Sequence, residues 1–178
     1  SVFHTQQLIN LSIKKMKKKT NPYNKITDNV KNHIEKIIKG SYQQAALGTI
    51  DKSGYPMVTK IIPMHWSDQI YLLLSNLSEH TKNLMANPRA CIYFAEKERH
   101  KVKSNNPRLT LQGTLERTIL RKDEPKFQTL LNQYTKIESG AKMWAMFTDF
   151  DFYIFTENRK LFIEGFGKAF ESASEDRF

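Results

Sequence analysis

The sequence predicts a mainly β fold, in which a closed or partly closed barrel is accompanied by a few helices. Short runs of apolar or alternating residues recur between residues 44 and 170, and turn residues separate them. Gly113 stands inside the longest run, where a glycine fits as a bend or bulge that turns a sheet at a barrel corner. Helical periodicity is limited to a few short segments, as expected of a small barrel.

Composition describes one soluble globular domain. The chain has 178 residues, of which 39% are hydrophobic and 26% charged. No run approaches the roughly 18 apolar residues of a membrane helix. The lone cysteine, Cys91, excludes an internal disulfide, and we expect it to be a buried thiol in a reducing cytoplasm. A Lys-rich segment follows a weak apolar stretch instead of preceding it, so we expect no signal peptide and a cytoplasmic location.

The net charge of +10 is concentrated near the N-terminus. Residues 1–40 hold nine lysines against Asp28 and Glu35, which gives a net +7. The Lys-rich block at 14–19 is expected to be a solvated arm, and contact with RNA or acidic lipid is the alternative. We therefore predict a basic arm over 1–25 and a single domain over 26–178. The near balance of charge in the domain predicts no specific nucleic-acid partner.

The first element is a helix over residues 27–39. Thr27 or Asp28 offers an N-cap, and Gly40 offers a stop. Apolar residues recur at helical spacing on the face expected to pack on the body: Ile26, Val30, Ile34, Ile37 and Ile38.

Three strands follow this helix. A hairpin turn at 51–54 joins the first two, and Gly54 can take the positive φ that other residues resist. A second turn at Ser67 and Asp68 leads into an apolar run typical of a buried strand. The three predicted strands cover residues 44–50, 55–64 and 70–74.

The segment that follows the third strand has the pattern of a short capped helix. Ser78 is placed to cap it with its hydroxyl, and Asn87 with Pro88 ends it. A strand that runs into a helix start leaves backbone N–H groups free, which outlines an anion site. The alternative is a plain connection with polar surface residues. The added donors of the anion site would be Ser75, Ser78, His80 and Lys82.

The second half of the chain continues with strands and two helices. Asp123, Glu124 and Pro125 give cap, acidic residue and proline in the preferred order at a helix start. A turn around residues 158–160 is expected to separate the last two strands. The predicted strands cover 90–95, 108–119, 150–156 and 161–170, and the predicted helices begin at Asp123 and cover 141–147.

Three motifs then carry a family resemblance: ALGTID at 46–51 with G-x-P at 54–56, S-x-H-x-x-N-L-x-x-N-P at 78–88, and LFIEGFGKA at 161–169 behind Asp151 and Phe152. The first two resemble the pyridoxamine 5'-phosphate oxidase-like, FMN-binding split-barrel superfamily. The third resembles its haem-utilisation branch, whose members bind and degrade haem on the same barrel. The resemblance covers about residues 27–175. It implies a mainly β (α+β), six- to seven-stranded split β-barrel with peripheral helices, and a homodimer with cofactor sites along the shared interface.

An excess of aromatic residues in the C-terminal third agrees with pairing of subunits. Aromatic rings beyond the volume of a small core are candidates for an interface or for contact with a flat ligand. Ordinary core packing is the alternative for each ring. The residues concerned are Phe147, Phe150, Phe152, Tyr153, Phe155, Phe162, Phe166 and Phe170.

The resemblance also bears on FMN. The family's flavin phosphate is held by an Arg early in the second strand, a Lys at the end of that strand, and an Arg-Lys pair at the short helix. The first two positions here correspond to Thr59 and Met64, and Glu79-His80 replaces the basic pair. The loss of these cations weakens the case for FMN and favours the haem branch.

For haem, the branch carries its iron-ligating His in a C-terminal extension. The last histidine here is His100, so the resemblance implies a ligand beyond Phe178 or a relocated one, for which we name His80. His65 and His100 are further options, and a structural or surface role is the alternative for each. Asp151 stands where the branch has an acidic residue near the haem, and is the catalytic candidate. The predicted cofactor-binding residues are Lys60, Ser75, Ser78, His80, Thr81, Lys82 and Arg89.

Our leading hypothesis is a cytoplasmic dimer that binds haem and opens it with O₂ and an external electron donor. A second hypothesis is an FMN-dependent oxidoreductase with the flavin phosphate at the short helix. A third is a non-catalytic haem or flavin carrier, or a scaffold. No nucleophile or general-base constellation stands out, which argues against a hydrolase or transferase.

Overall fold

The computed structural model describes residues 21–173. These residues form nine strands: β1 (Asn24–Lys25), β2 (Gln44–Ile50), β3 (Pro56–Ile61), β4 (Met64–Trp66), β5 (Gln69–Ser75), β6 (Arg89–Ala95), β7 (Arg108–Arg117), β8 (Phe150–Gly165) and β9 (Lys168–Ala173). The helices are α2 (Asp28–Ile38), α3 (Glu79–Ala86), the 3₁₀ turn η1 (Lys103–Asn105), α4 (Pro125–Tyr134) and α5 (Ala141–Trp144). Seven of the strands have six residues or more, which confirms the predicted mainly β class.

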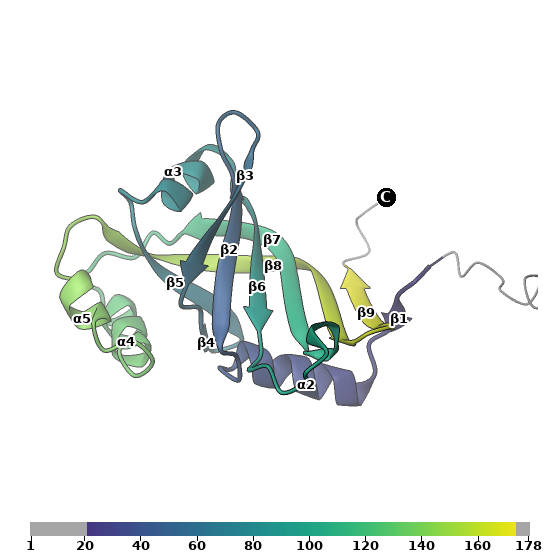
Figure 1. Cartoon of the computed structure of the whole chain (residues 1–178). Coiled ribbons are helices and arrows are strands. Elements are labelled where there is room, and N and C mark those ends of the chain that lie inside the picture. The colour runs from purple at the N-terminus through teal and green to yellow at the C-terminus, as the bar shows by residue number, and fades with distance from the viewer. Residues whose placement is uncertain (1–20, 174–178) are drawn as a thin grey trace, which may run out of the picture.

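The strands form one sheet that curls into a partly closed barrel (Figure 1). The order is β1-β9-β8-β7-β6-β2-β3, and β5 branches from the first half of β8. Only β1 and β9 pair in parallel. Within residues 21–173, β3 and β5 are not paired, so the barrel stays open along that line. The fold is therefore a split β-barrel, with α2 across one end and α3 at the other (Figure 1).

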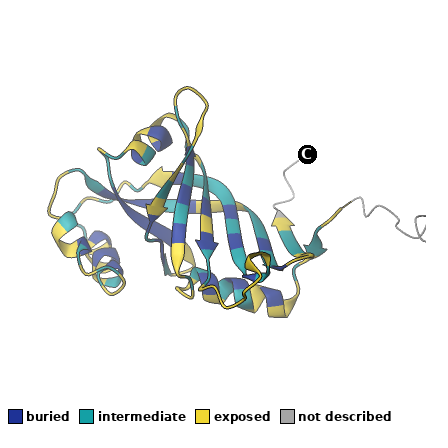
Figure 2. Ribbon diagram, in the orientation of Figure 1, coloured by how far each residue is buried: buried dark blue, intermediate teal, exposed yellow. Residues whose placement is uncertain are grey.

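β5 separates two hydrophobic cores, which explains why its sequence is an unbroken apolar run. Ile70, Leu72 and Leu74 point into the barrel interior. Tyr71 and Leu73 point the other way, into a core formed with α4 and α5. A strand buried on both faces has no reason to alternate. Along β2, by contrast, buried residues alternate with partly buried ones, as the dark blue and teal bands on the strands in Figure 2 show.

The aromatic excess is explained largely by these two cores. Tyr153, Phe155 and Phe162 are buried in the barrel core. Phe152 is buried in the second core, where its ring meets those of Phe127 and Tyr134 edge to face. Of the aromatic residues named above as interface candidates, only Phe147 and Phe166 are well exposed, at 54% and 84%. The interpretation of ordinary core packing therefore holds for most of them.

Helix α2 has the predicted cap and the predicted packing. The Thr27 hydroxyl accepts the backbone N–H of Val30 at 3.4 Å. Val30, Ile34 and Ile37 are buried against the barrel. The Asp51–Gly54 hairpin is also confirmed, since Gly54 has φ +86° and the Asp51 carboxylate accepts the N–H groups of Ser53 and Tyr55.

The predicted strand over residues 55–64 is wrong at its end. It breaks at Ile62 and Pro63, because Pro63 has no N–H to offer a neighbouring strand. The two carbonyls at the break accept hydroxyl hydrogens instead, Ile62 from Tyr134 at 2.5 Å and Pro63 from Tyr42 at 2.9 Å. The chain then re-enters the sheet as β4, and Ser67 and Asp68 form the predicted turn with positive φ.

Three further boundaries differ from the prediction. Residues 158–160 are not a turn, because β8 runs straight through them, and the chain reverses at Phe166 and Gly167, where Gly167 has φ +75°. The strand predicted to reach Ile119 ends at Arg117, and Ile119 is 97% exposed. The cap of α4 is Glu124 and not Asp123, whose carboxylate is held by two hydrogen bonds from Arg121.

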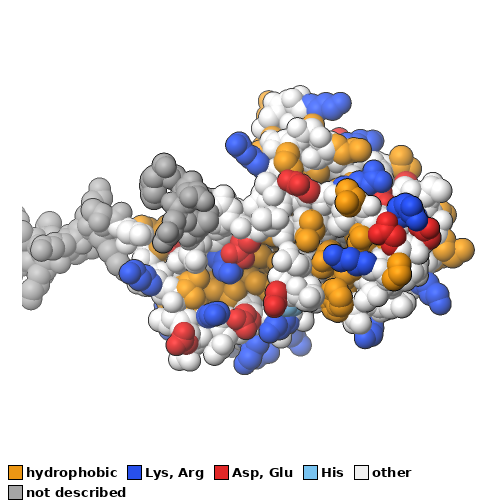
Figure 3. Space-filling view, turned by 180° about the vertical axis from the view of Figure 1, so that it is seen from behind, with side chains coloured by type: hydrophobic (Ala, Val, Ile, Leu, Met, Phe, Trp, Pro, Cys, Tyr) orange, Lys and Arg blue, Asp and Glu red, His pale blue; other side chains and the backbone are white. Residues whose placement is uncertain are grey.

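No helix within residues 21–173 is both long enough and apolar enough to cross a membrane. Seen from behind, the end that carries α4 and α5 shows hydrophobic side chains scattered among Lys and Arg (Figure 3). Exposed side chains there include Met143 and Met146, at 59% and 81%. The Lys-rich block at 14–19 lies outside the described residues.

Candidate functional site

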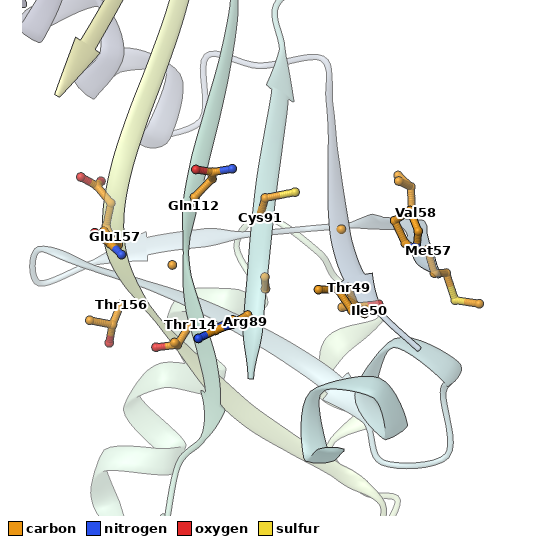
Figure 4. Close-up of a pocket in the computed structure, with 15 residues that line it drawn as sticks. Thr49, Ile50, Met57, Val58, Arg89, Cys91, Gln112, Thr114, Thr156 and Glu157 are labelled. Carbon is orange, nitrogen blue, oxygen red and sulfur yellow. The ribbon is translucent and has the colours of Figure 1, made fainter. Parts of the chain in front are cut away.

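A cavity of about 690 Å³ lies on the outer face of the sheet, across β2, β3, β6, β7 and β8. We call it the outer-face cavity. Side chains from all five strands stand side by side along it (Figure 4). Its lining residues are Gly48, Thr49, Ile50, Pro56, Met57, Val58, Arg89, Ala90, Cys91, Gln112, Gly113, Thr114, Thr156, Glu157 and Asn158.

The walls of the cavity are mainly apolar and carry few charges. Ile50, Pro56 and Val58 form one side, and Val58 is 72% exposed although it is a large aliphatic residue. Arg89 is the only cation among the lining residues. The carboxylate of Glu157 is paired with Lys160 at 3.0 Å, so its charge is already compensated.

Two glycines keep the floor of the cavity flat. A Cβ atom at Gly48 would lie 2.5 Å from the sulfur of Cys91, and a Cβ at Gly113 would lie 2.0 Å from the carbonyl oxygen of Thr156. At Gly113 the obstacle is backbone, so there is no room for a side chain, whereas a side chain at Gly48 would displace the Cys91 sulfur. At Gly113 the β7–β8 register shifts, which confirms the predicted bulge. The sheet therefore offers a smooth surface on which a planar group can lie.

Cys91 is not the buried thiol that the sequence predicts. It is half-buried and lines the cavity, because β6 alternates. Ile92 and Phe94 face the barrel core and are fully buried. Because side chains alternate along a strand, Cys91 and Tyr93 face the outer side.

The residues predicted to form an anion site at the start of α3 lie close together, but their hydrogen bonds differ from the prediction. Ser78 is the N-cap residue, yet its hydroxyl does not cap the helix. It donates to the carbonyl of Ser75 at 2.7 Å and shares a hydrogen bond with the Thr81 hydroxyl at 2.8 Å. Thr81 is fully buried and so faces no ligand. The side chain of Ser75 donates to Asp149.

His80 is held between α3 and β3. Its Nδ1 lies 3.0 Å from the Thr59 hydroxyl oxygen. Burial lowers the pKa of His80 below its ordinary value, so the ring is neutral at pH 7. With Nδ1 engaged, Nε2 is the nitrogen left for a ligand.

The α3 cluster and the outer-face cavity are neighbours. Asn83 of α3 donates from Nδ2 to the Thr49 hydroxyl at 3.1 Å and approaches the sulfur of Met57 at 3.8 Å. Thr49 and Met57 both line the cavity. α3 thus contacts one wall of the cavity at two residues.

Asp151 lies at the centre of a separate polar network at the start of β8. It is 7% exposed and accepts a hydrogen bond from Asn76 Nδ2 at 2.7 Å. The guanidinium of Arg117 lies 3.1 Å from it. Tyr153 donates its hydroxyl hydrogen to Asn76 Oδ1 at 2.9 Å. Asp151 does not line the outer-face cavity.

The predicted site residues are thus divided among several places. Ser75, Ser78, His80 and Thr81 gather at α3, and Asp151 joins them indirectly through Asn76, which follows Ser75 in the chain. Lys60 and Lys82 are exposed, on β3 and α3. Of the predicted set, Arg89 alone lines the cavity.

Most residues that line the cavity could not be recognised from the sequence. Gln112, Thr114 and Thr156 line it, but they look like ordinary outward-facing polar residues of a sheet. The available sign was the pair of glycines, Gly48 in β2 and Gly113 in β7, at outward or bulged positions of the two strands that flank β6. Glycine inside a strand marks close approach by another group.

The cavity fits a flat, largely apolar ligand with an acidic edge. Its volume lies in the range of about 300–1,000 Å³ usual for small-molecule sites, and Arg89 can meet a carboxylate or phosphate. None of the lining residues is a histidine. In the part of the chain that the structure describes, no group of three or more His, Cys, Asp or Glu is placed to hold a metal ion. The lining therefore fits the ring of a haem and its acidic groups, and it offers no histidine to the iron.

Residues 30–156 match the family described as pyridoxamine 5'-phosphate oxidase. A curated Vibrio cholerae protein described as heme oxygenase HutZ is 24% identical over 131 residues, which is 73% of this chain and 74% of that protein. A solved structure described as HutZ, the heme storage protein from Vibrio cholerae, has a TM-score of 0.61 at 19% identity. The match covers 71% of this chain and 89% of the HutZ chain.

Two longer proteins are also similar in structure. A heme binding protein from Mycobacterium smegmatis has a TM-score of 0.68 at 22% identity over 78% of this chain. Campylobacter jejuni ChuZ has a TM-score of 0.73 at 22% identity over 85% of this chain. This chain spans 56% and 62% of their respective lengths. These likenesses show a shared fold, and the family match extends from α2 to the middle of β8. The chain therefore belongs to the pyridoxamine 5'-phosphate oxidase family, and it has a split β-barrel.

Proposed function

We propose that this protein binds haem in the outer-face cavity. The observation that carries the proposal is the cavity itself, a flat apolar surface with a single cation, Arg89, among its lining residues. A porphyrin needs apolar contact for its faces and a cation for its propionates, and the cavity offers both. The similar proteins from Vibrio cholerae and Mycobacterium smegmatis, a heme oxygenase and a heme binding protein, support the same ligand.

A second copy of this chain would cover the cavity. The outer face is open and carries exposed hydrophobic residues, with Tyr55 at 71%, Val58 at 72% and Tyr93 at 39%. Exposed apolar surface of this kind is characteristic of interfaces. In the proposed homodimer, these residues exclude water from the ring faces, and Arg89 holds the acidic edge.

The finer proposal is oxidative opening of the ring. Bound iron would supply the activation of O₂, with electrons from an external donor. The chain's own part is to bind the ring, orient it and keep water away. His80, whose Nε2 is free, stays the candidate ligand among the described histidines, and Asp151 is proposed to orient polar groups through Asn76 and Arg117. Lys60 and Lys82 are proposed as further cations for the acidic groups.

A haem titration followed by absorbance tests the binding proposal. The Soret band should shift and saturate near one haem per subunit. Arg89→Glu should weaken binding about five- to thirtyfold, because it removes an attractive charge and adds a repulsive one, each worth about 0.5–1 kcal/mol. Lys126→Glu, an exposed lysine of α4, is the matched control and should bind as the parent does.

The same samples separate the alternatives. Adding a reductant and air to the complex should bleach the Soret band if the ring is opened, whereas a stable band indicates a carrier. A protein that takes up FMN with a flavin spectrum, and shows no Soret shift with haem, would contradict the proposal and favour the FMN-dependent oxidoreductase.

A further inference from the structure

A second, polar pocket lies beyond the end of β6, between α2 and the loop that joins β6 to β7. We call it the α2–loop pocket, and its volume is about 730 Å³. Its lining residues are Asn29, Asn32, His33, Lys36, Ser41, Glu96, Lys97, Arg99, His100 and Pro107. None of these residues lines the outer-face cavity.

The helix contributes one complete face to this pocket. Positions 29, 32, 33 and 36 have the i, i+3, i+4, i+7 spacing of a single helical stripe. A neighbouring stripe, Val30, Ile34 and Ile37, is buried in the barrel core. The first stripe is therefore fixed in its direction by the packing of the second, and it presents two amides, an imidazole and an ammonium group.

The charge in the pocket is positive and largely uncompensated. Lys36, Lys97 and Arg99 form no ion pair within residues 21–173. Glu96 is the one carboxylate among the lining residues, and its Oε1 lies 2.8 Å from Nε2 of His33. The ring of His33 is held in turn by edge-to-face contact with Phe162, 5.0 Å between centroids. Glu96 is thus engaged by His33, and the charges of Lys36, Lys97 and Arg99 are left facing the solvent.

The loop that carries two of these cations is fixed by one buried side chain. Asn106 is 6% exposed, and its Oδ1 accepts the backbone N–H groups of Arg99 and His100, both at 2.9 Å. Its Nδ2 donates to the carbonyls of His100 and Lys103 at 3.2 and 3.3 Å. A loop that is already ordered loses less conformational entropy on binding a ligand than a flexible loop does.

From this arrangement we infer that the α2–loop pocket binds a small anion that carries two or more phosphate groups. The cations stand on both sides of the pocket, Lys36 on the helix and Lys97 and Arg99 on the loop, so that one phosphate group can meet each side. Asn29 and Asn32 add amide donors. The pocket has no Phe, Tyr or Trp for stacking of bases, which favours a compact anion over a nucleic acid.

Calorimetric titration of the full chain with inorganic pyrophosphate tests this inference. To lower the positive charge of the Lys-rich block at 14–19, the parent for the experiment carries Lys17→Gln, Lys18→Gln and Lys19→Gln. This parent should bind one pyrophosphate per subunit. Adding Lys97→Glu and Arg99→Glu should weaken binding by at least about tenfold, since two attractive charges become repulsive. Lys126→Glu on the same background is the matched control and should leave the affinity unchanged.

A second variant separates a built site from a loose cluster of cations. Asn106→Ala keeps every charge but removes four hydrogen bonds from the loop, and it should weaken pyrophosphate binding severalfold while the protein still melts cooperatively. Equal affinity in the parent and in the Lys97→Glu, Arg99→Glu variant would overturn the inference. Tighter binding of longer oligonucleotides without binding of pyrophosphate would overturn it as well. Haem titrations should be the same for all these variants, which keeps this test apart from that of the outer-face cavity.

Discussion

Gly113 shows how a single missing Cβ shapes both the barrel and the cavity. A Cβ at this position would lie 2.0 Å from the Thr156 carbonyl oxygen and 3.0 Å from the Phe155 ring. Backbone atoms of β8 cannot give way without breaking the β7–β8 pairing. The glycine is thus required by packing, independently of any ligand.

Gly113→Ala should therefore destabilise the protein by about 3 kcal/mol, the upper part of the usual range for overpacking. For a domain of this size that corresponds to a fall in Tm of about 6–12 °C. Thr114→Ala, the next residue of β7, is the control and should change stability by only about 0.5 kcal/mol. Thermal melts of the three proteins measure this, and equal Tm values for the glycine variant and the parent would contradict it.

His80 makes the stability depend on pH. Burial lowers its pKa in the folded protein, while the unfolded chain keeps the ordinary value of 6.5. Below pH 6.5 the unfolded state therefore binds more protons than the folded state does. The contribution of neutral His80 is complete above that pH and is lost as the pH falls towards the lowered value.

His80→Gln should accordingly flatten the dependence of Tm on pH between 7.5 and about 5. His65→Gln is the matched control, since His65 lies in the short strand β4. Melts at several pH values in buffers of equal ionic strength provide the measurement. If the slope of Tm against pH stays the same in the His80 variant and falls in the His65 variant, a group other than His80 causes the pH dependence of stability.

At the scale of the element, local chemistry was a good guide at some turns and caps, but not at Ser78, whose hydroxyl does not cap α3. Thr27 and Gly54 behave as predicted, because capping and positive φ are decided within a few residues. Boundaries set by distant partners were missed. Residues 158–160 resemble a turn, yet they stay extended because β7 and β9 pair with β8 on its two edges. Pairing of β8 with β7 and β9 thus outweighs the local preference of residues 158–160 for a turn.

The junction of the arm and the barrel gives a second test at this scale. β1 pairs with β9 through Asn24 and Phe170, and the Arg159 guanidinium lies 5.6 Å from the centre of the Tyr23 ring. Removal of residues 1–20 should leave Tm within about 3 °C of the parent, about 1 kcal/mol for a domain of this size. Removal of 1–25 also deletes β1 and Tyr23, and should lower Tm further. Loss of cooperative melting in the shorter deletion would show that the arm belongs to the core.

At the scale of the whole molecule, the cavity could be predicted from the sequence far less well than the fold. Alternation and turns are properties of one strand at a time, whereas the cavity combines five strands. Arg89 was found because it follows a recognisable motif, and Gln112 and Thr156 were not, because nothing in their neighbourhood distinguishes them. The division of the aromatic residues between two cores depends in the same way on the position of β5.

The proposed homodimer is tested by light scattering at micromolar concentration. The mass should be twice the 20.8 kDa of the subunit, with an interface of about 2,000 Å² or more. Val58→Asp places a charge on the open face beside the cavity and should shift the protein to the monomer. Ile119→Asp, an equally drastic change at a residue that is 97% exposed elsewhere, should leave the mass unchanged. A parent that scatters as a monomer would contradict the proposal.

The position of β8 also determines the order in which the chain can fold during synthesis. β8 is the partner of β5, β7 and β9, and its residue Phe155 stands in register with Ile70, far back in the sequence. The β2–β3 hairpin can form as soon as it leaves the ribosome, because its contacts are local. β5 and β7 must wait with open edges until residues 150–165 emerge, and such edges invite aggregation. A nascent chain that stops before residue 150 is therefore expected to depend on chaperones, although most of the barrel has already been made.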